Sequence, residues 1–241
     1  MEDFKINGIV LNAKDYSEKD KLVTLFTLEL GKITAKLKGV KSSKAKLKYA
    51  GQPFCFGEWV LNKTGDHYTV VSCSIIDTFY ELTSDYELML CATKFLKLIN
   101  LVFKSGIINE KLFITLINAL KIILYDSCEK DLVLVKFYID FLNMAGYGVD
   151  FSYCSRCGKN FINDVYFDLK TGGVVCMHCS NNDSDIYLSK QEFAYLKLIS
   201  STELKKINTI RIQGDILRQI KGLIEKKIKI IFDVDLMWKY N

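Results

Sequence analysis

Four cysteines in two close pairs are the residues whose types and spacing most clearly indicate chemistry. Two residues separate Cys154 from Cys157 and Cys176 from Cys179, and 18 residues lie between the pairs. This doubled C-x2-C spacing is typical of sites in which four thiolates bind one zinc ion. Such a site is closed, because no coordination position is left for water, so it predicts a structural role. The alternatives are two disulfides or unrelated buried thiols.

A run of seven lysines is the second candidate site. It contains no acidic residue, whereas the remainder of residues 1–80 holds five lysines against nine acids. The lysines of the run are Lys32, Lys36, Lys38, Lys41, Lys44, Lys46 and Lys48. A localised basic stretch on a chain of net charge +5 favours binding to a polyanion such as DNA. The alternative is a solvated charged face without a ligand.

No catalytic constellation is visible in the sequence. It has neither a glycine-rich phosphate loop nor an H-E-x-x-H motif. Of the two histidines, His67 falls in a predicted turn and His178 lies between two of the paired cysteines. The carboxylates of Asp233 and Asp235 are best interpreted as surface charges. The remaining cysteines have apolar neighbours and are predicted core residues: Cys55, Cys73, Cys91 and Cys128.

Residues 1–80 show the pattern of a small closed β-barrel. Strand-like runs occupy residues 4–11, 22–28, 33–38, 54–61 and 68–73. In the third run Ile33, Ala35 and Leu37 alternate with polar residues, which predicts that these three point inward. Small barrels bind single strands with one strand face and the adjoining loops. Four aromatic residues are candidates for base stacking, although core packing is their more common use: Phe54, Phe56, Trp59 and Tyr68.

From residue 81 the apolar spacing changes to that of helices. Helices are predicted over residues 87–103, 110–125, 131–145 and 215–227, and Ser189 with Glu192 forms a capping box that opens a further one. The cysteine pairs fall in a module at about 150–182. We therefore expect two domains, residues 1–80 and 81–241, in an α+β multidomain protein.

Composition and length narrow the class of protein. The chain has 241 residues, of which 49% are hydrophobic, enough for a sizeable core. No apolar run reaches the roughly 20 residues that a membrane span needs. The first residues do not resemble a signal peptide, so a cytoplasmic protein with reduced thiols is expected. A second basic stretch covers residues 205–229.

Several segments together resemble the RecO family of bacterial recombination mediators. The resemblance follows the chain in order through residues 8–11, 15–27, 31–32, 38–40, 52–54, 141–147, 154–158 and 172–176. The most specific stretch is the helix end at residues 141–147 that leads into Cys154-Ser-Arg-Cys157-Gly158. Some relatives lack the full cysteine set, and the basic run here uses lysine where relatives often place arginine.

The resemblance implies an N-terminal OB-type barrel and an α-helical domain that carries a four-cysteine zinc module. It also implies a non-enzymatic role in DNA repair and homologous recombination. In that role the protein binds single- and double-stranded DNA and anneals complementary strands. Its partners would be RecR, the C-terminal tail of single-strand binding protein and, indirectly, RecA. The expected location is the bacterial nucleoid.

Two other functions stay open at this stage. A nuclease that uses the zinc ribbon as an accessory module would need a carboxylate cluster, which the sequence does not reveal. A transcription-type zinc-ribbon adaptor would bind duplex DNA at specific sequences. Magnesium-dependent cleavage and sequence-specific duplex binding are the respective tests.

Overall fold

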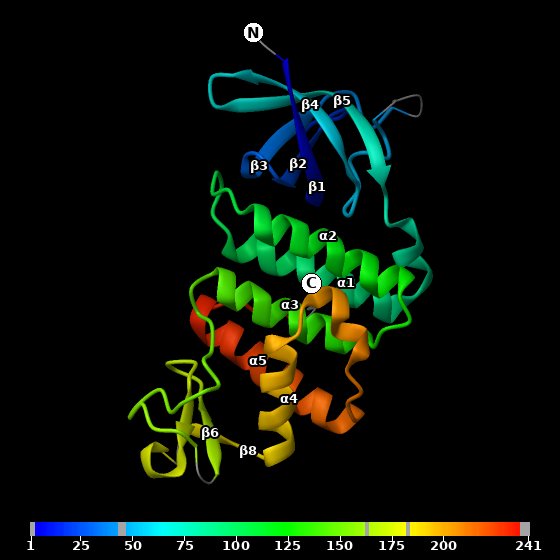
Figure 1. Cartoon of the computed structure of the whole chain (residues 1–241). Coiled ribbons are helices and arrows are strands. Elements are labelled where there is room, and N and C mark those ends of the chain that lie inside the picture. Colours follow the sequence, from blue (N-terminus) through cyan, green and yellow to red (C-terminus); the bar gives the residue numbers. More distant parts are fainter. Residues whose placement is uncertain (1–2, 43–46, 162–163, 182–183, 237–241) are drawn as a thin grey trace. The chain divides into compact units, whose positions relative to one another are not determined.

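The computed structural model describes residues 3–42, 47–161, 164–181 and 184–236. The chain divides into two compact units, Met1–Leu120 and Lys121–Asn241. Figure 1 shows the elements of both units. In the described part of the chain, none of the helices combines the length and the apolar character that crossing a bilayer requires.

The first unit is built on a closed five-stranded barrel with strand order β1-β2-β3-β5-β4. Its strands are β1 (Asp3–Asp15), β2 (Lys21–Thr27), β3 (Gly31–Leu37), β4 (Phe56–Thr64) and β5 (His67–Asp77). All neighbouring pairs are antiparallel except β3 and β5, which run parallel. This confirms the predicted barrel. One predicted strand start was wrong: Phe54 has φ +71°, a left-handed backbone that does not continue a strand, and β4 begins at Phe56.

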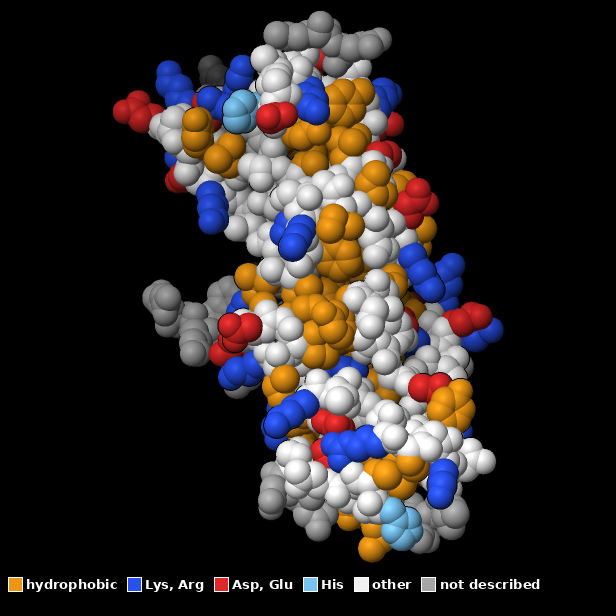
Figure 2. All heavy atoms as spheres, turned by 90° about the vertical axis from the view of Figure 1, so that its left-hand side faces the viewer, with side chains coloured by type: hydrophobic (Ala, Val, Ile, Leu, Met, Phe, Trp, Pro, Cys, Tyr) orange, Lys and Arg blue, Asp and Glu red, His pale blue; other side chains and the backbone are white. Residues whose placement is uncertain are grey.

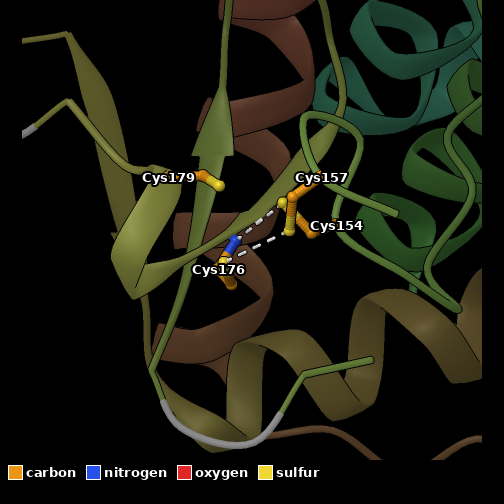
Figure 3. A group of neighbouring side chains, drawn as sticks. All are labelled: Cys154, Cys157, Cys176 and Cys179. Atoms are coloured by element: carbon orange, nitrogen blue, oxygen red, sulfur yellow. Dashed lines mark hydrogen bonds between the residues drawn. The ribbon is translucent and has the colours of Figure 1, made fainter. Parts of the chain in front are cut away.

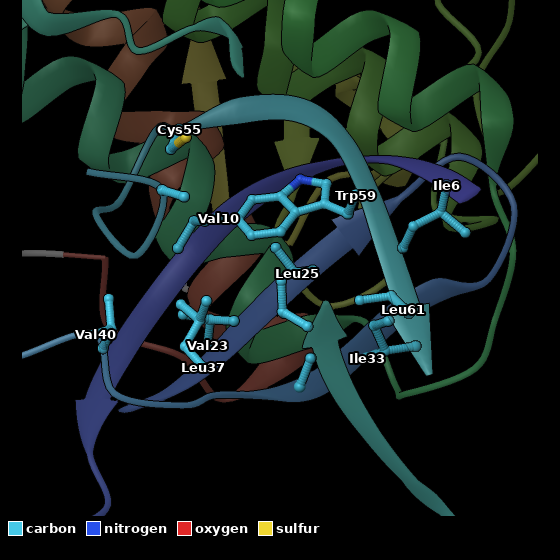
Figure 4. Close-up of a cluster of buried hydrophobic side chains, with 13 residues drawn as sticks. Ile6, Val10, Val23, Leu25, Ile33, Leu37, Val40, Cys55, Trp59 and Leu61 are labelled. Atoms are coloured by element: carbon cyan, nitrogen blue, oxygen red, sulfur yellow. The ribbon is translucent and has the colours of Figure 1, made fainter. Parts of the chain in front are cut away.

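The barrel interior is filled by side chains that alternate along the strands (Figure 4). Ile33, Ala35 and Leu37 of β3 are all buried, as their alternation predicts. Trp59 lies at the centre with no exposed surface, and its indole N–H donates to the Gly8 carbonyl at 2.9 Å. Because a buried N–H without a partner is costly, this hydrogen bond fixes the ring in the core. Trp59 is therefore not available to stack on bases.

The rest of the first unit is helical. It contains the 3-10 turn η1 (Tyr80–Ser84), α1 (Tyr86–Val102) and the greater part of α2 (Glu110–Tyr125). Aromatic rings join these helices to the barrel: Phe113 of α2 lies 5.9 Å from Phe26 and 6.1 Å from Phe56, centroid to centroid. Asp85 caps α1 by accepting a hydrogen bond from the Leu88 N–H.

A close backbone approach joins β3 to the α1–α2 connection. The Gly106 N–H donates to the Lys32 carbonyl at 3.0 Å, and the Lys32 ammonium donates to the Asn100 carbonyl at 2.6 Å. Gly31 has φ +66°, and a Cβ there would lie 2.1 Å from the Ile107 carbonyl oxygen. Only glycine allows both the left-handed turn and this approach.

The second unit is mainly helical. Its elements are α3 (Lys130–Met144), β6 (Val165–Asp168), β7 (Val174–Cys176), η2 (Met177–Cys179), β8 (Asp185–Leu188), α4 (Lys190–Ser201), η3 (Leu204–Thr209) and α5 (Gly214–Phe232). Helix α3 is buried around almost its whole circumference, as expected of a central helix. The capping box of Ser189 and Glu192 is present at the start of α4. One apolar face of the last predicted helix is buried along α5.

A pair of glycine substitutions tests the contact between β3 and the helical connection. We expect Gly31→Ala to lower the free energy of unfolding by about 3 kcal/mol or more, since it adds a steric clash to the cost of a left-handed alanine. Urea unfolding measures this loss. Gly39→Ala is the matched control, because Gly39 has φ +65° but nothing within 4 Å of a Cβ. It should lose only about 1–2 kcal/mol; equal losses would contradict the close approach.

Candidate metal centre and nucleic-acid interface

The four paired cysteines come together in the second unit (Figure 3). Their sulfur atoms all lie within 4.8 Å of one another. Thiolates that bind zinc tetrahedrally at about 2.3 Å are about 3.8 Å apart, so the cluster is close to that geometry. Cys154 is buried, whereas Cys157 is exposed and the other two are half-buried. The donor set can therefore bind one metal ion.

Short elements position the four sulfur atoms. The antiparallel sheet β7-β6-β8 forms the frame, and Cys176 ends β7 while Cys179 ends the following 3-10 turn. The first pair lies in the turn after residue 151, where the Gly158 N–H donates to the Cys154 carbonyl at 2.8 Å. Gly158 has φ +71°, which this tight turn requires.

Backbone N–H groups prepare Cys154 for the thiolate form. Burial alone would raise the pKa of this thiol, but the N–H groups of Cys176, Cys157 and Arg156 outweigh it and lower the pKa to about 6. The neighbouring thiols of Cys157 and Cys176 raise the pKa of Cys179 to about 12. Four thiolates repel one another at this distance, so a divalent cation is needed for all of them to ionise.

Arg156, between the first two cysteines, connects the parts of the module. Its guanidinium contacts Asp168 of β6 at 2.7 Å and Asp185 of β8 at 2.9 Å. It also donates to the Cys179 carbonyl. Both carboxylates are buried. Although burial raises the pKa of Asp168, Arg156, Thr171 and backbone N–H groups lower it to about 2. Sequence reasoning missed this role, since neither acid is close to Arg156 along the chain.

Lys227 of α5 is a buried cation beside the module. Its ammonium donates to the carbonyls of Tyr147 at 2.8 Å and Gly172 at 3.0 Å. Gly172 has φ +72°, and a Cβ there would lie 2.7 Å from the Lys227 nitrogen. Burial lowers the pKa of Lys227 to about 8. The helix is thereby tied to the β6–β7 turn, and this lysine is withdrawn from the basic stretch at residues 205–229.

The lysine run of the first unit is more dispersed than its sequence suggests. Lys36 forms an ion pair with Asp20 at 2.9 Å, and Lys41 forms one with Asp15 at 3.0 Å. Lys32 is half-buried against the helical connection, and burial lowers its pKa. Lys38 and Lys48 are exposed, and Lys44 and Lys46 lie outside the described residues. On the face seen in Figure 2, blue basic side chains are interspersed with acidic and apolar ones.

Asp20, in the β1–β2 connection, organises the start of the basic loop. One carboxylate oxygen accepts from the Gly39 N–H at 2.9 Å, and the other faces Lys36. The Gly39 N–H, followed by Lys36, lowers the pKa of Asp20. The acids that compensate the lysine run are thus supplied by another segment of the chain.

A groove of about 880 Å³ crosses the barrel over β3. It is lined by Tyr16, Leu22, Leu30, Lys32, Ile33, Thr34, Lys36, Asp66, His67, Tyr68, Thr69, Ser105, Gly106 and Ile108. The β1–β2 and β4–β5 connections and the α1–α2 connection supply its walls. The Lys36 ammonium lies 4.8 Å from the centroid of the Tyr16 ring, and the Lys63 ammonium lies 5.5 Å from that of Tyr68. Tyrosine rings beside lysines suit stacked bases and phosphates.

Only some of the residues that the sequence predicted for DNA binding line this groove. Lys32, Lys36 and Tyr68 line it, whereas Lys38, Lys41 and Lys48 do not. Phe54 is buried, and Phe56 packs on Phe113. Tyr16 and the walls supplied by the turns were missed, because only the closed barrel brings those connections to one face.

Removing the Arg156 guanidinium tests its role. We expect Arg156→Met to lower the free energy of unfolding by about 3 kcal/mol, because two buried carboxylates lose their cation. Urea unfolding at neutral pH measures it. The deficit should persist down to about pH 4 and shrink toward pH 2, as Asp168 becomes protonated in both states. Arg218→Met is the control: its ion pair with Asp215 is exposed and should contribute below about 0.5 kcal/mol. Equal effects would contradict the role.

Comparison with known proteins identifies the family of the chain. The N-terminal profile of recombination protein O matches residues 1–79, and its C-terminal profile matches residues 83–229. The DNA repair protein RecO of Caldicellulosiruptor saccharolyticus is 30% identical over 236 residues, which are 98% of this chain and 96% of that protein. The RecO of Clostridium novyi is 30% identical over 222 residues, 92% of this chain and 86% of that protein. The chain belongs to the RecO family of DNA repair proteins.

Proposed function

We propose that this chain is a non-enzymatic recombination mediator that binds DNA on its barrel and anneals complementary strands. The observation that carries the proposal is the groove over β3, which combines lysines and tyrosines on a barrel of the RecO family. Single-stranded DNA is the first ligand, and double-stranded DNA would use the same positive charges.

The groove suits contacts to the DNA backbone without readout of sequence. Lys32 and Lys36 lie on one strand, and their ammonium groups serve as point charges for phosphates. Tyr16 and Tyr68 offer ring faces on which any base can stack. A repair protein has to act on any broken sequence, and phosphate contacts provide binding of that kind. Annealing then needs the repulsion between two strands to be screened while the bases stay free to pair.

The ion pairs that Lys36 and Lys41 form with acidic residues lower the expected affinity for DNA. A phosphate that approaches Lys36 or Lys41 has to compete with Asp20 or Asp15. Surface ion pairs contribute at most about 1 kcal/mol, so phosphates can displace them. Lys38 and Lys48 are exposed and have no ion pair among the described residues. The proposed DNA surface therefore consists of the groove and these two flanking lysines, with Lys44 and Lys46 as further candidates.

The proposed partners are those that the resemblance to the RecO family implies. We propose that the chain acts with RecR to help RecA load onto DNA coated by single-strand binding protein. We also propose that the helical part of the chain binds the acidic C-terminal tail of single-strand binding protein. Lys205, Lys226 and Lys229 are exposed and supply positive charge of the kind that an acidic tail needs.

We propose that the metal is a single structural zinc ion held by Cys154, Cys157, Cys176 and Cys179. Four thiolates at tetrahedral spacing favour zinc among the common divalent ions. The ion would hold the short strands of the module together. A zinc-ribbon nuclease is the alternative function, and a magnesium-dependent cleavage assay on single- and double-stranded DNA distinguishes it.

Removing charge from the groove tests the DNA site. If about four lysines contact phosphates, log affinity for single strands should fall with log salt with a slope near −3. Lys36→Gln with Lys38→Gln should flatten this slope by about one unit and weaken binding several-fold at low salt. Fluorescence anisotropy with a labelled oligonucleotide measures both. Lys5→Gln is the matched control, since Lys5 pairs with Glu58 outside the groove; an equal effect of both variants would contradict the assignment.

Two equally buried cysteines provide a test of the zinc site. Cys154 and Cys55 are both 1% exposed, so Cys→Ser makes the same chemical change in the same degree of burial. Cys154→Ser should lose the bound zinc and a large part of the roughly 10–16 kcal/mol that structural zinc supplies to folding. Cys55→Ser should retain about one zinc per chain. Elemental analysis with thermal unfolding measures the difference, and a wild-type chain purified without metal at full stability would refute the proposal.

A further inference from the structure

The strand β5 has an open edge over half of its length. It pairs with β3 only at Ala35–Tyr68 and Lys36–Thr69. Beyond Thr69, within the part of the chain that the structure describes, its only ladder partner is β4. Among the described residues, the backbone groups of residues 70–76 that face away from β4 therefore have no ladder partner and form an open edge. Such edges are templates for pairing with a further strand.

The open edge lacks the usual protection against strand pairing. Residues 67–76 contain no lysine, arginine, aspartate, glutamate or proline. Apolar β-branched side chains are exposed along it: Val71 is 49% exposed, Ile75 43% and Ile76 57%. Charged residues and proline are the common devices that keep edge strands apart. Two bulges, at Val71 and Ile76, give the described part of this edge some protection, and they restrict the regular stretch to residues 72–75.

The sequence of this edge complements itself. Residues 70–76 read Val-Val-Ser-Cys-Ser-Ile-Ile, which is symmetric in side-chain type about Cys73. In an antiparallel pair of two copies centred on Cys73, the exposed Val71 faces the exposed Ile75 of the other copy, whereas Val70 is buried in its own barrel. Ser72 faces Ser74 of the other copy. Because the segment carries no charge, two copies bring no like charges into opposition.

We propose that two copies of this chain associate through the open edge of β5, in antiparallel register centred on Cys73. The interface is isologous, since Ser72 of each copy meets Ser74 of the other within the regular stretch, and Val71 and Ile75 flank this contact. It adds one short ladder of hydrogen bonds and a small apolar contact. An interface of this size is typical of weak association, so the dimer depends on protein concentration. Where the proposed DNA groove holds, a dimer carries two of them, but the association itself does not rest on DNA binding.

Sedimentation of the full chain, without DNA, tests the proposal. The average mass should rise from 27.6 kDa toward twice that value as the concentration increases from micromolar to millimolar. Ser72→Lys combined with Ser74→Lys places like charges directly opposite each other at two symmetric positions. This variant should raise the dissociation constant by about tenfold or more. Both serines are exposed, so the fold, checked by circular dichroism, should survive.

A charge-reversed partner makes the test specific to the register. Ser72→Glu with Ser74→Glu should also be monomeric, but a mixture with the lysine variant should dimerise, because opposite charges now face each other. Two lysines placed elsewhere, at the exposed Ser201 and Thr209, control for added charge and should leave the dimer unchanged. Hydrogen exchange of residues 70–76 should slow as the dimer forms.

Three outcomes would overturn the proposal. The first is a chain that remains monomeric over the whole concentration range. A β5 edge that binds a strand of a different protein, in a chain that does not dimerise, belongs to this outcome. The second is a dimer that the lysine pair does not weaken. The third is a mixture of the lysine and glutamate variants that fails to dimerise, which would exclude the register centred on Cys73. DNA affinity is measured separately, so a failure here leaves the proposed DNA groove standing.

Discussion

Two residue pairs, Ala35–Tyr68 and Lys36–Thr69, close the barrel. Every other neighbouring pair of strands in the barrel is joined over a longer ladder. Among the residues that the structure describes, the parallel strands β3 and β5 are paired at these two positions only. This short contact closes the barrel, and beyond it the two strands are no longer hydrogen-bonded to each other. Residues of both strands at this short contact line the groove, namely Lys36 of β3 and Tyr68 and Thr69 of β5. The open edge of β5 begins where the contact with β3 ends. The proposed DNA site and the proposed dimer contact therefore have one geometric origin.

The cysteine module depends on charge in a way that the barrel does not. Its sheet has strands of four, three and four residues, too little apolar surface to fold by itself. Arg156 connects β6, β8 and the carbonyl of Cys179, and the four thiolates meet beside it. Arg156, together with the metal ion that we propose, thus supplements a small apolar core. Loss of Arg156 would leave the carboxylates of Asp168 and Asp185 without their cation. Loss of the proposed metal ion would leave four thiolates close together.

Features set by local periodicity could be predicted from the sequence. The strands, the helices, the capping box of Ser189 and the convergence of two C-x2-C pairs all rest on spacings within about 20 residues. Features set by the meeting of distant segments could not. Nothing near Lys36 or Lys41 indicated that Asp20 and Asp15 would pair with them. Nothing near Lys227 indicated that α5 would bury it. The lysine run was correctly identified as unusual, but its free charge was overestimated.

The ion pairs of the lysine run have a consequence for the DNA release that the proposed function requires. A surface of unpaired lysines would gain the full benefit of every phosphate contact and hold a strand tightly. Here the acids at positions 15 and 20 lie within 3.0 Å of two lysines, so a bound phosphate would share these ammonium groups with them. Because they compete for the same ammonium groups, they lower the net gain of each contact and speed its reversal. Weak, exchangeable contacts of this kind suit the proposed mediator role, in which a strand is bound only until its complement or a filament-forming protein takes it over.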